Sequence, residues 1–290
     1  MIERSFAFGE GAGLVGTVCL PDASAAQAGG VGQVLFNAGM VHRVGPHRIN
    51  VRLARALAAR GIPSIRFDLA GQGDSARAPG PRSSEEQAVV DLSSAMDALA
   101  GAASVARFAL FGFCSGGVHS YAAAQADPRI AGILLYDTYF YPTTWSRLNR
   151  YLLPIRETGL VSSLRRWMRR QVAKLPQPWR AGDASALAQA QGLFPTPTKH
   201  AFARTVRALH ERGTQVGVIY SGSFRELYNY GGQFRDAFAA HGIAELVSVD
   251  FLPATTHSDP RPEALVALLQ RVENWTARLD ARVREGAAKP

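Results

Sequence analysis

The chain has 290 residues, of which 47% are hydrophobic, and its formal net charge is +9. This length and composition allow one large hydrophobic core, and no run approaches the ~18 consecutive apolar residues of a membrane-spanning helix. Two cysteines, Cys19 and Cys114, make no disulfide framework. Because residues 1–5 also lack the basic-then-apolar pattern of a secretory signal, we expect a cytoplasmic protein.

Apolar runs alternate with helical patterns along most of the chain. Residues 1–20 are expected to form a hairpin around a glycine-rich turn, followed by an Ala/Gly/Ser-rich loop over 22–32. The pattern then predicts strands at 34–36, 62–68, 106–111, 130–136, 216–220 and 246–252, and helices at 49–59, 85–99, 118–125, 234–240 and 262–279. This alternation predicts an α/β fold, a mostly parallel sheet with helices on both faces and active residues at the carboxyl ends of the strands.

Residues 112–117 read Gly-Phe-Cys-Ser-Gly-Gly and join an expected strand to an expected helix. A Gly-x-nucleophile-x-Gly turn at such a junction presents its central side chain at the end of the sheet, since glycines leave room for the strained backbone. The helix N-terminus behind it favours a thiolate and a developing oxyanion. We therefore predict that Cys114 is a nucleophile. The alternative frame centred on Ser115 puts Phe113 where a small residue belongs, and Cys19 is expected to be a strand residue without chemistry.

Three segments of the chain resemble the α/β-hydrolase superfamily. Besides the turn at 112–117, they are Gly39 with Arg-Val-Gly-Pro-His-Arg at 43–48, and Arg-Phe-Asp-Leu-Ala-Gly-Gln-Gly-Asp-Ser at 66–75. The chain looks most like the hydrolases found alongside exosortase systems, which pair a Gly-x-Cys turn with a similar loop. The resemblance covers nearly the whole length and implies the α/β-hydrolase fold.

The same resemblance implies the residues that would work with Cys114. His257, between the last strand and the closing helix, is at the superfamily's position for the general base that takes the thiol proton. The acid that orients this histidine is open between Asp137, at the end of the strand at 130–136, and Glu226, past the strand at 216–220. Pairing with an arginine is the alternative for either carboxylate, and Asp259 is expected to be a loop residue.

The oxyanion is expected to be bound by two backbone N–H groups. Ser115 follows the nucleophile and supplies the first, and Met40 supplies the second, with Gly39 letting the chain approach closely. Ala38 stands where the superfamily usually has a histidine that braces this loop.

Residues 139–205 hold eleven lysines and arginines against two acidic residues, and so carry the entire net charge of +9. We expect them to form a cap between core segments 1–138 and 206–290, with a helix at 164–172 whose arginines lie opposite an apolar face. The basic side is interpreted either as a solvated face or as a contact for an acidic carrier protein, an anionic membrane surface or an acidic substrate. Without a recognition module, nucleic acid is not expected to bind. Tyr139, Tyr141 and Trp145 are expected to line an apolar acyl pocket, or to seat the cap.

These features predict an acyl hydrolase or acyltransferase that forms an acyl-enzyme on Cys114 from an ester or thioester, free or carrier-bound. The alternative is a non-catalytic accessory protein of the same fold that docks a carrier or membrane through its basic cap. We expect no cofactor, because the glycine-rich loop at 66–75 lacks the Lys-Ser/Thr of a phosphate cradle. We expect no metal, because His42 and His47 have no carboxylate or cysteine beside them in the sequence.

Overall fold

The computed structural model describes residues 1–22, 29–158, 196–259 and 261–287. Within these residues an eight-stranded sheet has the strand order β1-β2-β4-β3-β5-β6-β7-β8. Its strands are β1 (Ile2–Phe8), β2 (Leu14–Leu20), β3 (Val31–Phe36), β4 (Ser64–Phe67), β5 (Arg107–Phe113), β6 (Ile130–Tyr136), β7 (Gln215–Ser221) and β8 (Val247–Leu252). Only β2 runs in the opposite direction to the other seven strands, so the predicted mostly parallel sheet is confirmed.

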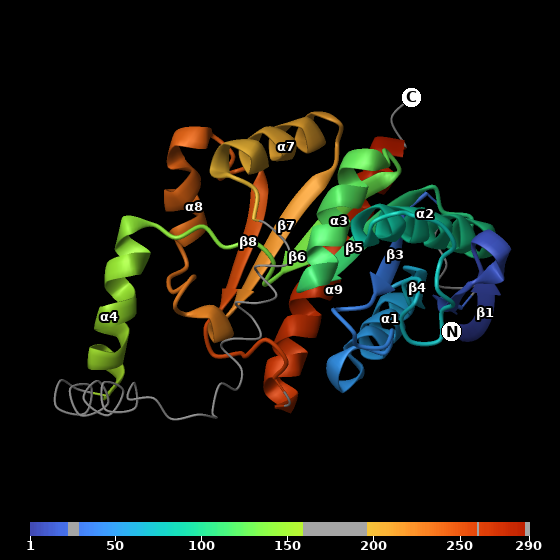
Figure 1. Ribbon diagram of the computed structural model, residues 1–290, viewed down its shortest axis with the longest axis horizontal. Coiled ribbons are helices and arrows are strands. Elements are labelled where there is room, and N and C mark those ends of the chain that lie inside the picture. Colours follow the sequence, from blue (N-terminus) through green and yellow to red (C-terminus); the bar gives the residue numbers. More distant parts are fainter. Residues whose placement is uncertain (23–28, 159–195, 260, 288–290) are drawn as a thin grey trace.

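Helices cover both faces of this sheet, as predicted (Figure 1). The α-helices are α1 (Ile49–Ala59), α2 (Ser84–Ala103), α3 (Ser115–Ala126), α4 (Thr144–Thr158), α7 (Lys199–Glu211), α8 (Gln233–Phe238) and α9 (Pro262–Ala287). Short 3-10 helices are η1 (Glu10–Ala12), η2 (Pro46–Arg48), η3 (Gly222–Phe224) and η4 (Ala239–His241). One core layer contains α2, α3, α7 and α8, and the other contains α1 and α9. In the described part of the chain, no helix combines the length and apolar character that crossing a membrane requires.

Local sequence explains where several elements begin. Helix α2 starts at a capping box, because the Ser83 hydroxyl accepts the Glu86 N–H and the Glu86 carboxylate accepts the Ser83 N–H. The helix predicted at 118–125 begins earlier, at Ser115, because the two glycines after it stay in the first helical turn. Strand β5 correspondingly continues to Phe113, so the chain passes from strand to helix at Cys114 itself.

The segment predicted as a cap is described only at its two ends. The helix predicted at 164–172 and most of the basic residues lie outside the described residues. Helix α4 lies away from the sheet beyond α8 (Figure 1), and its buried Asn149 donates to the Asn229 side chain. The division into core and cap stays a prediction, and its expected boundary at 205/206 falls inside the continuous helix α7.

Candidate active site

Cys114 forms the turn between β5 and α3. Its φ of 55° and ψ of −120° place a side-chain-bearing residue in a sparsely populated backbone region, which folds maintain mainly at functional sites. Glycines make the turn possible, because a Cβ on Gly112 would lie 2.5 Å from the Cα of Gly117. Cys114 is half-buried, whereas Cys19 is fully buried in β2, where burial raises the pKa of its thiol.

Ser115 lies within helix α3 and uses its hydroxyl for a structural contact. The backbone N–H of Gly39 donates to the Ser115 Oγ over 2.8 Å. This bond joins the loop after β3 to the start of α3. The positive φ of the turn is at Cys114, whereas Ser115 is already helical. The chain therefore does not adopt the alternative frame centred on Ser115.

Asp137 and His257 meet at the carboxyl ends of the strands. The Nδ1 of His257 lies 2.9 Å from the Oδ2 of Asp137. Ser221, the last residue of β7, donates its backbone N–H to the Asp137 Oδ1 (2.7 Å) and its hydroxyl to the Oδ2 (2.6 Å). Asp137 is only 4% exposed, and these three contacts compensate the cost of burying its carboxylate.

Of the two candidate acids, the structure brings Asp137 to His257 and leaves Glu226 exposed. The suggestion that Glu226 orients the histidine is thus not supported. The reason is the path of the chain: β7 ends at Ser221, and η3 then turns so that Phe224, not Glu226, packs edge-on against the imidazole.

Two serines that were not predicted from the sequence position His257. Besides Ser221, Ser223 contributes, because its Oγ accepts the backbone N–H of His257 over 2.6 Å. The N–H of Gly222 also donates to the carbonyl of Thr255, which ties η3 to the histidine loop. The signal available in the sequence was Ser-Gly-Ser at 221–223, directly after the strand expected at 216–220.

Aromatic rings and polar partners together set the protonation of His257. Its ring lies parallel to Tyr136 and 4.7 Å from the centroid of Phe113. Burial would lower the pKa of His257, but its hydrogen bond to Asp137 and its interactions with the charges of Asp137 and Cys114 outweigh burial and raise the pKa from 6.5 to about 9. At neutral pH the imidazolium is therefore the favoured form, beside the Cys114 sulfur.

This shift predicts a pH dependence of stability. A histidine whose pKa is higher in the folded than in the unfolded chain stabilises the fold fully below pH 6.5, and this contribution disappears as the pH rises towards 9. The free energy of unfolding should therefore fall by about 1–3 kcal/mol across this interval. Urea unfolding at pH 6 and 9.5 measures the loss, which should be absent in His257→Gln. An equal pH dependence in the two proteins would contradict the assignment.

The loop with the predicted oxyanion donors is held by Asn37 and Asp68. The Val41 N–H donates to the Ala38 carbonyl, which closes a tight turn over Gly39 (φ 57°) and Met40. The Asn37 side chain donates to the Val41 carbonyl (2.7 Å) and to the Asp68 Oδ1 (2.8 Å). Asparagine and aspartate thus brace the loop in which Ala38 replaces the usual histidine. The role of the Met40 and Ser115 N–H groups stays a prediction.

A charged cluster surrounds Asp68, although His42 has no carboxylate near it in the sequence. The fold brings one carboxylate oxygen each of Asp68 and Asp74 and a ring nitrogen of His42 to within 4.8 Å of one another. The Arg43 guanidinium lies among them, contacting Asp68, with its Nη1 2.7 Å from Asp74 and 2.8 Å from the His42 Nε2. A cation of the chain itself therefore neutralises this pair of carboxylates.

Of the three aromatic residues predicted to contact substrate, two are buried in the core and one is exposed. Tyr139 and Tyr141 are each 6% exposed, and their rings pack in the core against Tyr121 and Phe238 respectively. Their contacts match the alternative that they seat the following segment, because they have no surface free for an acyl chain. Trp145, on α4, is 44% exposed, and its substrate contact stays a prediction.

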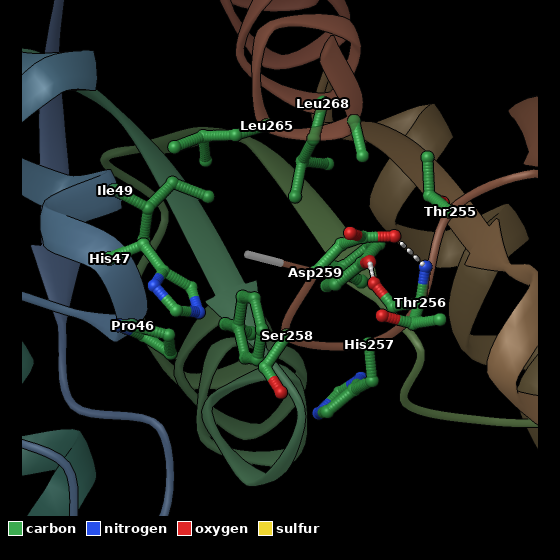
Figure 2. A pocket seen from close by; sticks show the side chains of 13 residues that line it. Pro46, His47, Ile49, Thr255, Thr256, His257, Ser258, Asp259, Leu265 and Leu268 are labelled. Carbon is green, nitrogen blue, oxygen red and sulfur yellow. Dashed lines mark hydrogen bonds between the residues drawn. The ribbon is translucent and has the colours of Figure 1, made fainter. Parts of the chain in front are cut away.

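A small hollow lies beside His257 on the α1 and α9 side. Figure 2 shows Ile49, Leu265 and Leu268 projecting into it, with His47 and His257 at its edges. Its volume of about 20 Å³ is just above what one water needs. The hollow is therefore too small for an acyl chain.

Most of the chain matches a known protein family. Residues 33–216 match the family described as "Serine aminopeptidase, S33". The chain belongs to the serine aminopeptidase family. Its description names serine, whereas this member has Cys114 at the turn where α/β-hydrolases carry the nucleophile. The likeness to the exosortase-associated hydrolases stays a prediction, and no curated protein matches the chain.

Several solved structures resemble nearly the whole length of this member of the serine aminopeptidase family. A hypothetical protein of Pseudomonas aeruginosa is 16% identical, with a TM-score of 0.60, over 96% of this chain and 93% of that chain. A thermophilic esterase of Thermogutta terrifontis is 17% identical, with a TM-score of 0.55, over 97% and 100%. Proline iminopeptidase of Mycobacterium smegmatis is 18% identical, with a TM-score of 0.54, over 97% and 99%. The fold is thus the α/β-hydrolase fold, and the family supports a hydrolase.

Proposed function

We propose that the protein is a cysteine acyl hydrolase or acyltransferase that forms an acyl-enzyme on Cys114 from an ester or thioester. One observation carries this proposal. His257 is hydrogen-bonded to Asp137, its pKa is raised by Asp137 and Cys114, and Cys114 occupies the strained turn at the carboxyl end of β5. A nucleophile beside a base that a third group orients is the arrangement that activates a thiol.

In the first half-reaction, the Cys114 sulfur attacks the acyl carbonyl carbon. The electron pair of the C=O bond moves onto oxygen, where the N–H groups of Ser115 and Met40 hydrogen-bond to it. When the carbonyl reforms, the bond to the leaving alkoxide or thiolate breaks, and His257 gives its proton to that group. The product is a thioester between the acyl group and Cys114.

In the second half-reaction, His257 takes a proton from the incoming water, hydroxyl or amine as it attacks this thioester. The sulfur of Cys114 then leaves with the electron pair of the C–S bond, which restores the starting enzyme. Asp137 keeps the imidazole oriented through its contact with Nδ1. Because amines attack thioesters readily, transfer to an amine competes with hydrolysis.

Intact mass spectrometry tests the proposal. The protein is incubated briefly with a panel of activated acyl esters and acyl thioesters, next to Cys114→Ala and the matched variant Cys19→Ala. We expect the mass of one acyl group on the native protein and on Cys19→Ala, and none on Cys114→Ala. Decay of the adduct in water or with added amine separates hydrolysis from transfer. No adduct and no turnover with any substrate would overturn the proposal and favour the accessory-protein alternative.

A further inference from the structure

A second, larger cleft opens near the candidate nucleophile. It lies between the segment 69–82 that follows β4, the first half of α2 and the second turn of α3, and its volume is about 230 Å³. His119, on α3, lines it and follows Cys114, which precedes this helix, by five residues. At 1.5 Å of rise per residue, about 7 Å along the helix axis separates these two residues. Strands β4 and β5 are both parallel to β3, so the cleft wall that follows β4 begins at the same edge of the sheet at which Cys114 follows β5.

The inner wall of the cleft is a chain of hydrogen-bonded polar groups. Asp91, only 2% exposed, accepts the N–H of Ala70 (2.8 Å) and the side-chain amide of Gln87 (2.7 Å). The Oε1 of Gln87 in turn accepts a hydrogen bond from Arg82 (3.4 Å). The Oε1 of Gln72 is buried and accepts no hydrogen bond from the described residues. A buried acceptor at the wall of a cleft is stable when a bound molecule supplies the missing donor.

The charges of the cleft favour an anion at its mouth. Arg77 and Arg82 line it, and Asp91 is the acidic residue among the described lining residues. Burial raises the pKa of Asp91, against the hydrogen bonds from Ala70 and Gln87 that lower it. Two further carboxylates lie near Arg82: Glu10, at 3.8 Å, and Glu86. Both are largely exposed, so solvent screens their attraction to Arg82. Arg77 is exposed above the cleft.

We propose that this cleft binds an anionic group of the substrate, a carboxylate or phosphate held by Arg77 and Arg82, while a hydroxyl or amide donor of the same molecule reaches Gln72. Guanidinium groups bind both anions through paired N–H donors. The carboxylate would be carried on the acyl chain, and the phosphate on the leaving group of a thioester. The inference rests on the proposed function only in making this molecule the acyl donor of Cys114.

A binding measurement tests the cleft without any reaction. Calorimetric titrations use Cys114→Ala, in which no acyl-enzyme forms, with monomethyl glutarate as the carboxylate probe and coenzyme A as the phosphate probe. Dimethyl glutarate and pantetheine are the uncharged controls. We expect at least one anionic probe to bind, and Arg77→Ala to weaken its binding about tenfold. Arg52→Ala, which removes an equal charge from the exposed side of α1, should leave binding unchanged. Binding of neither anion, or equal binding with and without Arg77, would overturn the proposal.

A kinetic measurement separates failure of the cleft from failure of the proposed function. Acylation of the protein by the p-nitrophenyl monoester of glutaric acid is compared with acylation by p-nitrophenyl valerate, an uncharged ester of similar length. We expect the anionic ester to be favoured, and Arg77→Ala to reduce this preference about tenfold. Equal acylation by both esters, with no binding of coenzyme A, would refute the cleft but not the nucleophile. Binding that depends on Arg77 without any acylation would refute the proposed function but not the cleft.

Discussion

His257→Gln is expected to lower turnover of an activated ester about 10³-fold, within the range measured for general acid–base groups. Glutamine retains polarity and much of the volume, but it can neither carry the proton from Cys114 nor deliver it to the leaving group. The histidine has both partners that this step requires, since it is hydrogen-bonded to Asp137 and its pKa is raised by Cys114. Stopped-flow release of p-nitrophenol measures the effect.

His210→Gln is the matched control, because this histidine is exposed at the end of α7. Turnover in the control should equal that of the native protein. A His257→Gln variant that folds, as judged by its unfolding transition, and keeps more than a tenth of the native turnover would contradict the assigned role.

Asp137→Asn is expected to lower turnover about 10²-fold, whereas Glu226→Gln should leave it unchanged. The smaller loss than for His257 follows from the nucleophile, because a thiol ionises more readily than a hydroxyl and depends less on the orienting acid. An amide cannot accept all the hydrogen bonds that Asp137 now receives from Ser221 and His257. Turnover as a function of pH gives the readout that a purely structural role would not change.

The pH profile should shift because the Asp137 carboxylate is one of the groups that raise the pKa of His257. In Asp137→Asn, the pKa of His257 should fall, and the pH-dependent loss of stability between pH 6.5 and 9 should shrink with it. If the pH profile of turnover were unchanged in Asp137→Asn and turnover fell strongly in Glu226→Gln, then Glu226 rather than Asp137 would orient the histidine.

Patterns within single elements predicted most of the fold. Helix α1 and strand β6 have the bounds expected from their apolar spacing. Helix α1 buries one face along its whole length, and every residue of β6 is buried. The turn at Cys114 was also predictable, since glycines at fixed distances mark a backbone that other residues cannot adopt. The start of helix α3 was predicted three residues too late, because glycines normally weaken a helix and here they lie inside its first turn.

Sequence alone determined the class of fold, the glycine-rich turn that carries Cys114 and the place of His257 between the last strand and the closing helix, because each depends on local spacing and on the order of strands and helices. Only the tertiary structure decided between Asp137 and Glu226. Both residues follow parallel strands that end at the same edge of the sheet, so the choice rests on which side chain reaches the imidazole. The tertiary structure also showed the serines that hold the Asp137–His257 pair, and the contact of Asn37 with Asp68 that braces the loop after β3. Such contacts join residues far apart in the chain, and their distances are fixed by packing rather than by local pattern.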